Sequence, residues 1–267
     1  MLSDMNIEEA LEADENYDGI GSTPSEWADR KHLPLGAVLM RAERPFRMLG
    51  IRDPKQQQLG RGAFGRAFKI DVHGQPTVLK LTRDPFEFAA SSALVGRVTK
   101  HIVPIYGVWA VQCSFAVRHW VPWYVVHRGL LTPFEKRDAK LIDAIYDLRH
   151  DENVDLKRMP HERGDRLMRA KWEGWLRDEL KELNITGPGV VARAMELLLE
   201  ISAGVREMHT IGIDWADCHS KNVMRDERGR LRISDVGWNT PHEDNDAEVT
   251  WFTPEAVGDH LAKLKAS

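Results

Sequence analysis

The feature that most constrains the fold is a change of pattern near Gly129, where a strand-rich first half is followed by a helix-rich second half. The strand-like segments are 56–72, which holds two strands around a glycine turn, then 77–81, 102–109 and 121–126. The helical segments carry apolar residues at helical spacing and cover 164–184 and 190–209. This order predicts an α+β protein with two lobes and a crevice between them.

Three parts are expected along the 267 residues. Residues 1–54 form an acidic arm and a helical extension, 55–128 the strand-rich lobe, and 129–267 the helical lobe. The first twenty residues hold seven acidic side chains and no Lys or Arg, which is typical of a solvated tail. Thr23-Pro24-Ser25-Glu26 then has the pattern of a helix start, and a helical segment is expected over roughly 24–49.

Composition argues against several classes of protein. Lys and Arg number 37 against 41 Asp and Glu, a net charge of −4, so we expect no broad attraction to nucleic acid or to anionic membrane. No apolar stretch is long enough to span a bilayer, and the acidic start differs from a secretory signal. The two cysteines, Cys113 and Cys218, lie far apart, which disfavours a disulfide scaffold or zinc site and favours the reducing cytoplasm.

A glycine-rich turn lies between two of the expected strands. Gly60, Gly62 and Gly65 form the pattern G-x-G-x-x-G. A dinucleotide-binding fold would continue into a helix, whereas residues 66–70 favour a strand, so the glycines suit a flap whose backbone covers phosphates. A glycine hairpin without a ligand fits the same pattern. Lys80 follows in an apolar strand and can point either toward nucleotide phosphates or into solvent.

The strongest candidate for chemistry is the segment 212–237. Asn222 follows Asp217 by five residues, and Asp235 follows it by eighteen. Apolar alternation on either side of residues 227–230 predicts a hairpin that returns Asp235 to the side of Asn222. A carboxylate and an amide oxygen that converge suit a hard cation such as Mg²⁺. Asp217, beside them, could orient an attacking hydroxyl and accept its proton.

The glycine turn, the strand lysine, the Asp217–Asn222 loop and Asp235 follow one another along the chain in the order of the protein-kinase-like superfamily. The chain resembles this superfamily over roughly residues 55–255. The resemblance implies phosphoryl transfer from ATP with Mg²⁺. It implies that the three glycines cover the ATP phosphates, that Lys80 holds the α- and β-phosphates, and that Asp217 is the catalytic aspartate. Asn222 and Asp235 would ligate magnesium. The residues implied to contact the nucleotide at the hinge are Val126 and Arg128.

The resemblance also implies a carboxylate partner for Lys80. Between Lys80 and Glu135 the only acidic residues are Asp84 and Glu87, which makes Glu87 the candidate by elimination. Glu87 is also the third residue after Asp84, so it could instead complete a capping box at the start of a helix. Both interpretations stay open at this point.

The catalytic loop departs from the pattern of most protein kinases. Trp215-Ala216-Asp217 stands where the family has His-Arg-Asp, and without that arginine we expect activity that needs no phosphorylated activation loop. Asp217-Cys218-His219 resembles aminoglycoside- and choline-kinase-type enzymes, and also compact serine/threonine kinases of bacteriophages. The latter would place the protein in a host-cell cytoplasm. Lys221 could supply the positive charge that other members place at the position of His219, or be a simple surface lysine.

The implied fold has a small antiparallel sheet in the first lobe and a helical second lobe that is truncated after the activation segment. Thr253-Pro254-Glu255 resembles the Ala-Pro-Glu that closes this segment, and twelve residues follow it. Either the N-terminal extension and an insert at 132–185 replace the peptide-binding platform, or the substrate is not an extended peptide. Thr253 could also be the N-cap of a last helix that ends near Lys265.

The function expected from these residues is transfer of the γ-phosphoryl group of ATP to a Ser or Thr hydroxyl of a protein substrate. A small-molecule kinase of the aminoglycoside or choline type is the first alternative, and a nucleotide-binding pseudokinase is the second. No nucleic-acid or membrane partner is expected, and the oligomeric state is left open. Trp172 and Trp175 are expected to pack in the core rather than to mark a docking surface.

Overall fold

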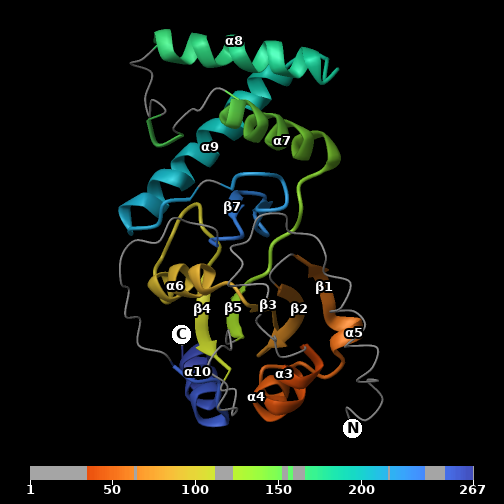
Figure 1. Cartoon of the computed structure of the whole chain (residues 1–267), viewed down its shortest axis with the longest axis vertical. Coiled ribbons are helices and arrows are strands. Elements are labelled where there is room, and N and C mark those ends of the chain that lie inside the picture. Colours follow the sequence, from red (N-terminus) through yellow and green to blue (C-terminus); the bar gives the residue numbers. More distant parts are fainter. Residues whose placement is uncertain are drawn as a thin grey trace, which may run out of the picture. The chain divides into compact units, whose positions relative to one another are not determined.

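The computed structural model describes residues 35–62, 65–111, 123–151, 156–158, 166–215, 217–237 and 250–266 (Figure 1). The chain divides into two compact units, each built from separate stretches of sequence. Unit 1 comprises Met1–Phe88, Tyr106–Arg128 and Ala247–Ser267, and unit 2 comprises Ala89–Ile105 and Gly129–Asp246. The structure is of the α+β class, as the sequence predicts.

Unit 1 is organised around a five-stranded sheet in the order β1-β2-β3-β5-β4. The strands are β1 (Gln58–Arg61), β2 (Gly65–Val72), β3 (Gln75–Thr82), β4 (Ile105–Ala110) and β5 (Tyr124–Gly129). Strands β2 and β3 are antiparallel, and the two residues between them, His73 and Gly74, both have positive φ. A two-residue turn of this kind matches the twist of a hairpin. The strands predicted within 56–72 and over 77–81 are therefore confirmed as β1, β2 and β3.

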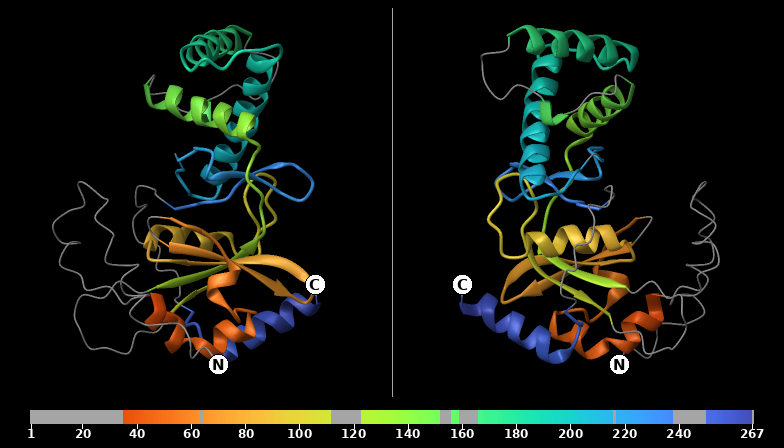
Figure 2. Two further views of the ribbon diagram at one scale, coloured as in Figure 1. Left: turned by 90° about the vertical axis from the view of Figure 1, so that its right-hand side faces the viewer. Right: turned by 60° about the vertical axis from the view of Figure 1, so that its left-hand side comes forward.

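One face of this sheet carries the core of unit 1. The helices on it are α3 (Leu35–Arg41), α4 (Glu43–Met48) and α10 (Pro254–Ala266), with the single turn α5 (Pro54–Gln57) beside β2 (Figure 2). Phe46 from α4 lies 4.7 Å from Phe252 between ring centroids, and Trp109 from β4 lies 5.6 Å from the same ring. Side chains from the N-terminal extension and the C-terminus thus share one core with the sheet.

The division into units differs from the expected parts of the chain at three places. The helical extension within 1–54 is not separate from the strand-rich lobe, because Phe46 and its neighbours are buried against the sheet. The C-terminal residues do not belong to the helical lobe: 247–267 are part of unit 1, where Ala110 exchanges backbone hydrogen bonds with Thr250 and Phe252 and where Val257 is fully buried. Residues 89–105, expected in the strand-rich lobe, belong to unit 2.

The predicted last helix is confirmed as α10. The Thr253 hydroxyl accepts a hydrogen bond from the Ala256 N–H at 3.2 Å, and its carbonyl accepts one from Val257. Thr253 is therefore an N-cap, and Pro254 occupies the first helical position, where its missing N–H is not needed.

A buried histidine and a partly exposed one connect α10 to the sheet. His127 on β5 is fully buried, and its Nδ1 lies 2.9 Å from Nε2 of His260 on α10. The other ring nitrogen of His127 lies 2.8 Å from the Thr77 hydroxyl on β3. Burial lowers the pKa of His127 to about 3 and that of His260 to about 4, the latter with help from Lys263. Both rings are therefore neutral at physiological pH, so one ring nitrogen donates the hydrogen bond between them and the other accepts it.

This pair predicts a loss of stability in mild acid. Folding lowers both pKa values. Below about pH 6.5 the two histidines therefore bind protons in the unfolded chain but stay neutral in the folded chain. The free energy of unfolding consequently decreases as the pH decreases. His127 alone is expected to cost about 2 kcal/mol between pH 6.5 and 5. Denaturant unfolding at pH 7 and pH 5 measures this loss. The double variant His127→Gln/His260→Gln should show a much smaller one, and an equal loss in both proteins would refute the assignment.

Unit 2 is mainly helical, with α7 (Lys136–Asp151), α8 (Arg166–Glu182), α9 (Val190–Thr210) and a short turn, η1 (Leu156–Arg158). Helix α6 (Pro85–Leu94) begins in unit 1 and ends in unit 2. The predicted helices over 164–184 and 190–209 correspond to α8 and α9. Trp172 is buried on α8, 5.4 Å from the Trp175 ring, which confirms the expected core packing of Trp172. Among the described residues, no helix is long and apolar enough to cross a membrane.

A short hairpin completes unit 2. Strands β6 (Val223–Arg225) and β7 (Leu231–Ile233) pair antiparallel. On its other side, Ile233 donates its backbone N–H to the His101 carbonyl and accepts the Val103 N–H. Asp138 on α7 accepts hydrogen bonds from Arg193 on α9 and Arg225 on β6, both at distances below 3 Å. Helices α7 and α9 and the hairpin are thereby held to one another.

Candidate functional site

The predicted glycine turn connects β1 and β2 in unit 1. Gly62 donates its N–H to the Gly65 carbonyl at 2.9 Å, and residues 63–64 lie outside the described part of the chain. A Cβ on Gly65 would overlap the backbone carbonyl of Leu81 on β3, so the close approach of two strands requires this glycine. A Cβ on Gly60 or Gly62 would meet no described atom within 4 Å. The described structure therefore leaves room for a side chain at these two positions and does not require glycine there.

Lys80 pairs with Glu87, as the elimination argument predicts. The Lys80 Nζ lies 2.6 Å from Glu87 Oε1, with the two side chains only 13% and 3% exposed. Glu87 is in the first turn of α6, whose helix start is set by Asp84 accepting the Phe86 N–H at 2.8 Å. The buried Glu87 carboxylate thus contacts the lysine, while Asp84 caps the start of the helix.

The predicted hairpin in unit 2 is confirmed, and it places Ser234, the residue before Asp235, opposite Asn222. Val223 is opposite Ile233 in the β6–β7 register, and the next residues along, Asn222 and Ser234, share a backbone hydrogen bond of 2.7 Å. Asp235 follows directly and accepts the Gly237 N–H through Oδ1 at 3.1 Å. The turn at the tip is closed by Asp226, whose side chain accepts the N–H groups of Arg228 and Arg230.

Asp217 is held by two residues of its own loop. The Asn222 amide donates to Asp217 Oδ2 at 2.7 Å, and Nε2 of His219 lies 3.5 Å from Oδ1. The Lys221 backbone N–H donates to Nδ1 of His219 at 3.1 Å, so the proton of a neutral His219 sits on Nε2, facing the carboxylate. The contact with Asp217 raises the pKa of His219 despite partial burial. The loop therefore fixes the direction of the Asp217 carboxylate.

The residues around Asp217 have donors suited to a hard cation. The side-chain amide nitrogen of Asn222 is directed at Asp217, so the amide oxygen of Asn222 is the atom that could bind a cation. Asp235 would add a carboxylate oxygen. Oxygen donors of this kind fit Mg²⁺ better than a softer metal. Among the described residues, no group of three or more His, Cys, Asp or Glu side chains is suited to a metal.

Cysteine chemistry is excluded at this loop. Cys218 follows Asp217 directly, but its side chain is fully buried, and burial raises the pKa of the thiol to about 12. A thiol with this pKa carries almost no thiolate at neutral pH and is a poor nucleophile.

A residue that the sequence analysis did not identify braces the loop. Asp143 on α7 accepts the Ser220 backbone N–H at 2.8 Å and the Ser220 hydroxyl at 3.0 Å. Ser220 lies between His219 and Lys221, so this double contact fixes the middle of the segment that orients Asp217. The two residues are 77 positions apart, and no local pattern signals their pairing.

The remaining predicted site residues are placed as follows. The Lys221 side chain is exposed, so both of its interpretations stand. Val126 is 1% exposed in the middle of β5, and Arg128 is half-buried two residues later, near the end of that strand. Ala216, the middle residue of Trp215-Ala216-Asp217, and residues 121–122 of a predicted strand lie outside the described part.

A comparison with models of protein families found no match to this chain. A search of curated proteins found no matching relative either.

Proposed function

We propose that this protein is an ATP- and Mg²⁺-dependent phosphotransferase that moves the γ-phosphoryl group to a Ser or Thr hydroxyl of a protein. The observation that carries the proposal is the arrangement of Asp217, Asn222 and Asp235. The Asn222 amide contacts Asp217 at 2.7 Å, and the hairpin pairs Asn222 with Ser234, the residue before Asp235. In the proposal, Asp217 is the proton acceptor, and Asn222 and Asp235 are the two oxygen donors. The buried Lys80–Glu87 pair and the two glycines that the fold does not require support the same assignment.

The chemistry assigned to these residues is in-line transfer. The acceptor oxygen attacks the γ-phosphorus, the bond from that phosphorus to the β-bridging oxygen breaks, and ADP leaves. The acceptor's proton passes to the Asp217 carboxylate, which His219 and Asn222 hold in place. Lys80 would hold the α- and β-phosphates, and Asn222 and Asp235 would hold Mg²⁺, which neutralises charge on the triphosphate. Catalysis is then mostly positioning and electrostatic stabilisation.

A small-molecule acceptor is the second candidate. Asp217-Cys218-His219 favours it, because histidine two residues after the aspartate is the pattern of aminoglycoside- and choline-kinase-type enzymes. The third candidate, a pseudokinase, is disfavoured because Lys80, Asp217, Asn222 and Asp235 are all present.

The test is a phosphotransfer assay with the purified full chain, γ-labelled ATP and Mg²⁺. Label is expected on the protein itself or on proteins of a bacterial lysate, and chelation of Mg²⁺ should remove it. Label confined to small metabolites would establish the second candidate, and nucleotide binding without turnover would establish the pseudokinase. Absence of both binding and turnover would end the proposal.

A further inference from the structure

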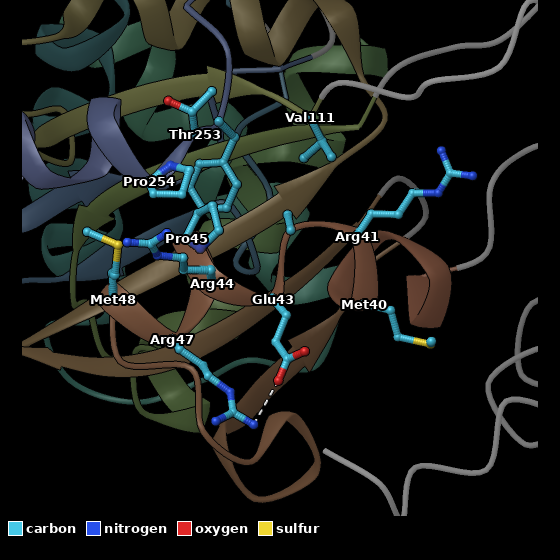
Figure 3. Close-up of a pocket in the computed structure, with 12 residues that line it drawn as sticks. Met40, Arg41, Glu43, Arg44, Pro45, Arg47, Met48, Val111, Thr253 and Pro254 are labelled. Atoms are coloured by element: carbon cyan, nitrogen blue, oxygen red, sulfur yellow. Dashed lines mark ion pairs between the residues drawn. The ribbon is translucent and has the colours of Figure 1, made fainter. Parts of the chain in front are cut away.

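Unit 1 has a cavity that the proposed function does not use. It has a volume of about 760 Å³ and lies between the α3–α4 segment and the start of α10 (Figure 3). Its wall is formed by residues 40–45, 47 and 48, with Val111 and Phe252, Thr253 and Pro254 closing the other side. This surface is made entirely by unit 1.

The lining combines exposed apolar side chains with positive charge. Met40 and Met48 are 53% and 37% exposed, which is unusual for large apolar residues. Three exposed arginines, Arg41, Arg44 and Arg47, lie on this surface with two carboxylates, Glu43 in the lining and Glu255 near Arg44, so these five side chains carry a net charge of +1 (3 − 2). Glu43 pairs with Arg47 at 2.7 Å, on a surface where both side chains are nearly half exposed. Such a surface suits a segment that is both acidic and apolar.

The chain itself contains a segment of this composition. Residues 1–20 hold seven of the 41 acidic side chains and none of the 37 Lys and Arg, so they carry −7 while residues 21–267 carry +3 (37 − 34). Apolar residues are interleaved with these acids; they are Leu2, Met5, Ile7, Leu11, Tyr17 and Ile20. Flexible methionines on the cavity wall can adapt to side chains of different shape.

The connection along the chain keeps this segment within reach of the cavity. Fourteen residues, 21–34, separate it from Leu35, and the cavity wall begins at Met40. A stretch of that length can span at most about 50 Å. Binding within one chain also proceeds at an effective concentration on the order of millimolar, so a weak contact is enough to keep the site filled.

We propose that residues 1–20 dock in cis on the surface formed by Met40, Arg41, Arg44 and Met48, with their carboxylates on the arginines and their apolar side chains against the methionines. The arm is then a ligand of its own chain rather than a solvated tail. This inference does not depend on phosphotransfer.

The test is photo-crosslinking in the full chain. Met48 is replaced by p-benzoylphenylalanine, and equal amounts of ¹⁴N- and ¹⁵N-labelled protein are mixed, irradiated, digested and analysed by mass spectrometry. Crosslinks from position 48 to residues 1–20 are expected within one isotope label. Their yield should fall severalfold at 1 M salt, where the screening length shrinks from about 10 Å to about 3 Å. The same probe at exposed Leu183, in unit 2, is the matched control and should give few such crosslinks.

Charge variants complete the design. Arg41→Glu/Arg44→Glu should reduce the crosslink yield to the control level, and adding Glu8→Lys/Glu9→Lys/Glu12→Lys to that variant should restore most of it. Arg47 is left unchanged because it already pairs with Glu43. Restoration separates loss of the contact from misfolding. Crosslinks of mixed isotope would show docking on a second copy, and no crosslinks to residues 1–20 would show an unbound arm; either result overturns the proposal.

Discussion

Asp217→Asn is expected to reduce phosphoryl transfer at least about 100-fold while leaving the fold intact. The amide retains the size of the carboxylate and can still accept the hydrogen bond from Asn222, which now measures 2.7 Å. It cannot accept the proton of the attacking hydroxyl, so the lost function is chemical rather than structural. Initial rates with γ-labelled ATP, together with thermal melts of both proteins, measure the two effects separately.

Asp214→Asn is the matched control for this prediction. Asp214 lies three residues earlier, and its carboxylate contacts Lys157 at 3.0 Å and His209 at 3.1 Å instead of facing Asn222 and His219. The same chemical change there should leave the transfer rate within about twofold of the unmodified protein, because its partners Lys157 and His209 lie outside the Asp217 loop and partly exposed ion pairs contribute little to stability. If Asp217→Asn behaved like Asp214→Asn, the catalytic assignment would be wrong.

Lys80→Met is expected to destabilise the protein by about 3–5 kcal/mol, which corresponds to a fall of roughly 10 °C in the melting midpoint. Glu87 is 3% exposed and 2.6 Å from the lysine, so removal of the lysine deprives a buried carboxylate of its counter-charge. The cost arises from the charge that remains, since methionine fills much of the volume of the lysine stem. This effect can be measured without nucleotide and is independent of catalysis.

Two variants sharpen the test. Lys80→Met/Glu87→Met removes both charges and should recover most of the lost stability, because a buried ion pair can be replaced by apolar side chains at little net cost. Lys69→Met changes an exposed lysine on the neighbouring strand β2 and should alter stability by less than about 0.5 kcal/mol. A single variant Lys80→Met as stable as Lys69→Met would contradict a buried, paired Lys80.

The parts of the candidate site that could be predicted are those set by short-range patterns. Asp217 and Asn222 are five residues apart in one loop, and the alternation around residues 227–230 predicts the hairpin that seats Asp235. Glu87 follows from the near absence of acids after Lys80. In each case the partners are close in sequence, so turn chemistry and strand period are enough to bring them together.

Contacts between distant segments could not be predicted in the same way. The Asp143–Ser220 brace joins residues 77 positions apart, and the His127–His260 bond joins residues 133 positions apart. The acidic α10 N-terminus resembles the end of an activation segment, and that likeness favoured the wrong unit for the helix. Burial of Val257 and Phe252 against Phe46 and the sheet decided its position.

The sequence by itself determined the α+β class, the order of strands and helices, the glycine turn and the Asp217–Asn222–Asp235 hairpin, because periodicity and turns act over a few residues. Only the tertiary structure decided that the N-terminal helices and α10 share the core of unit 1, which side chains brace the Asp217 loop, and where two histidines become neutral. Those outcomes depend on which apolar faces meet and what they desolvate, and no local pattern encodes that choice.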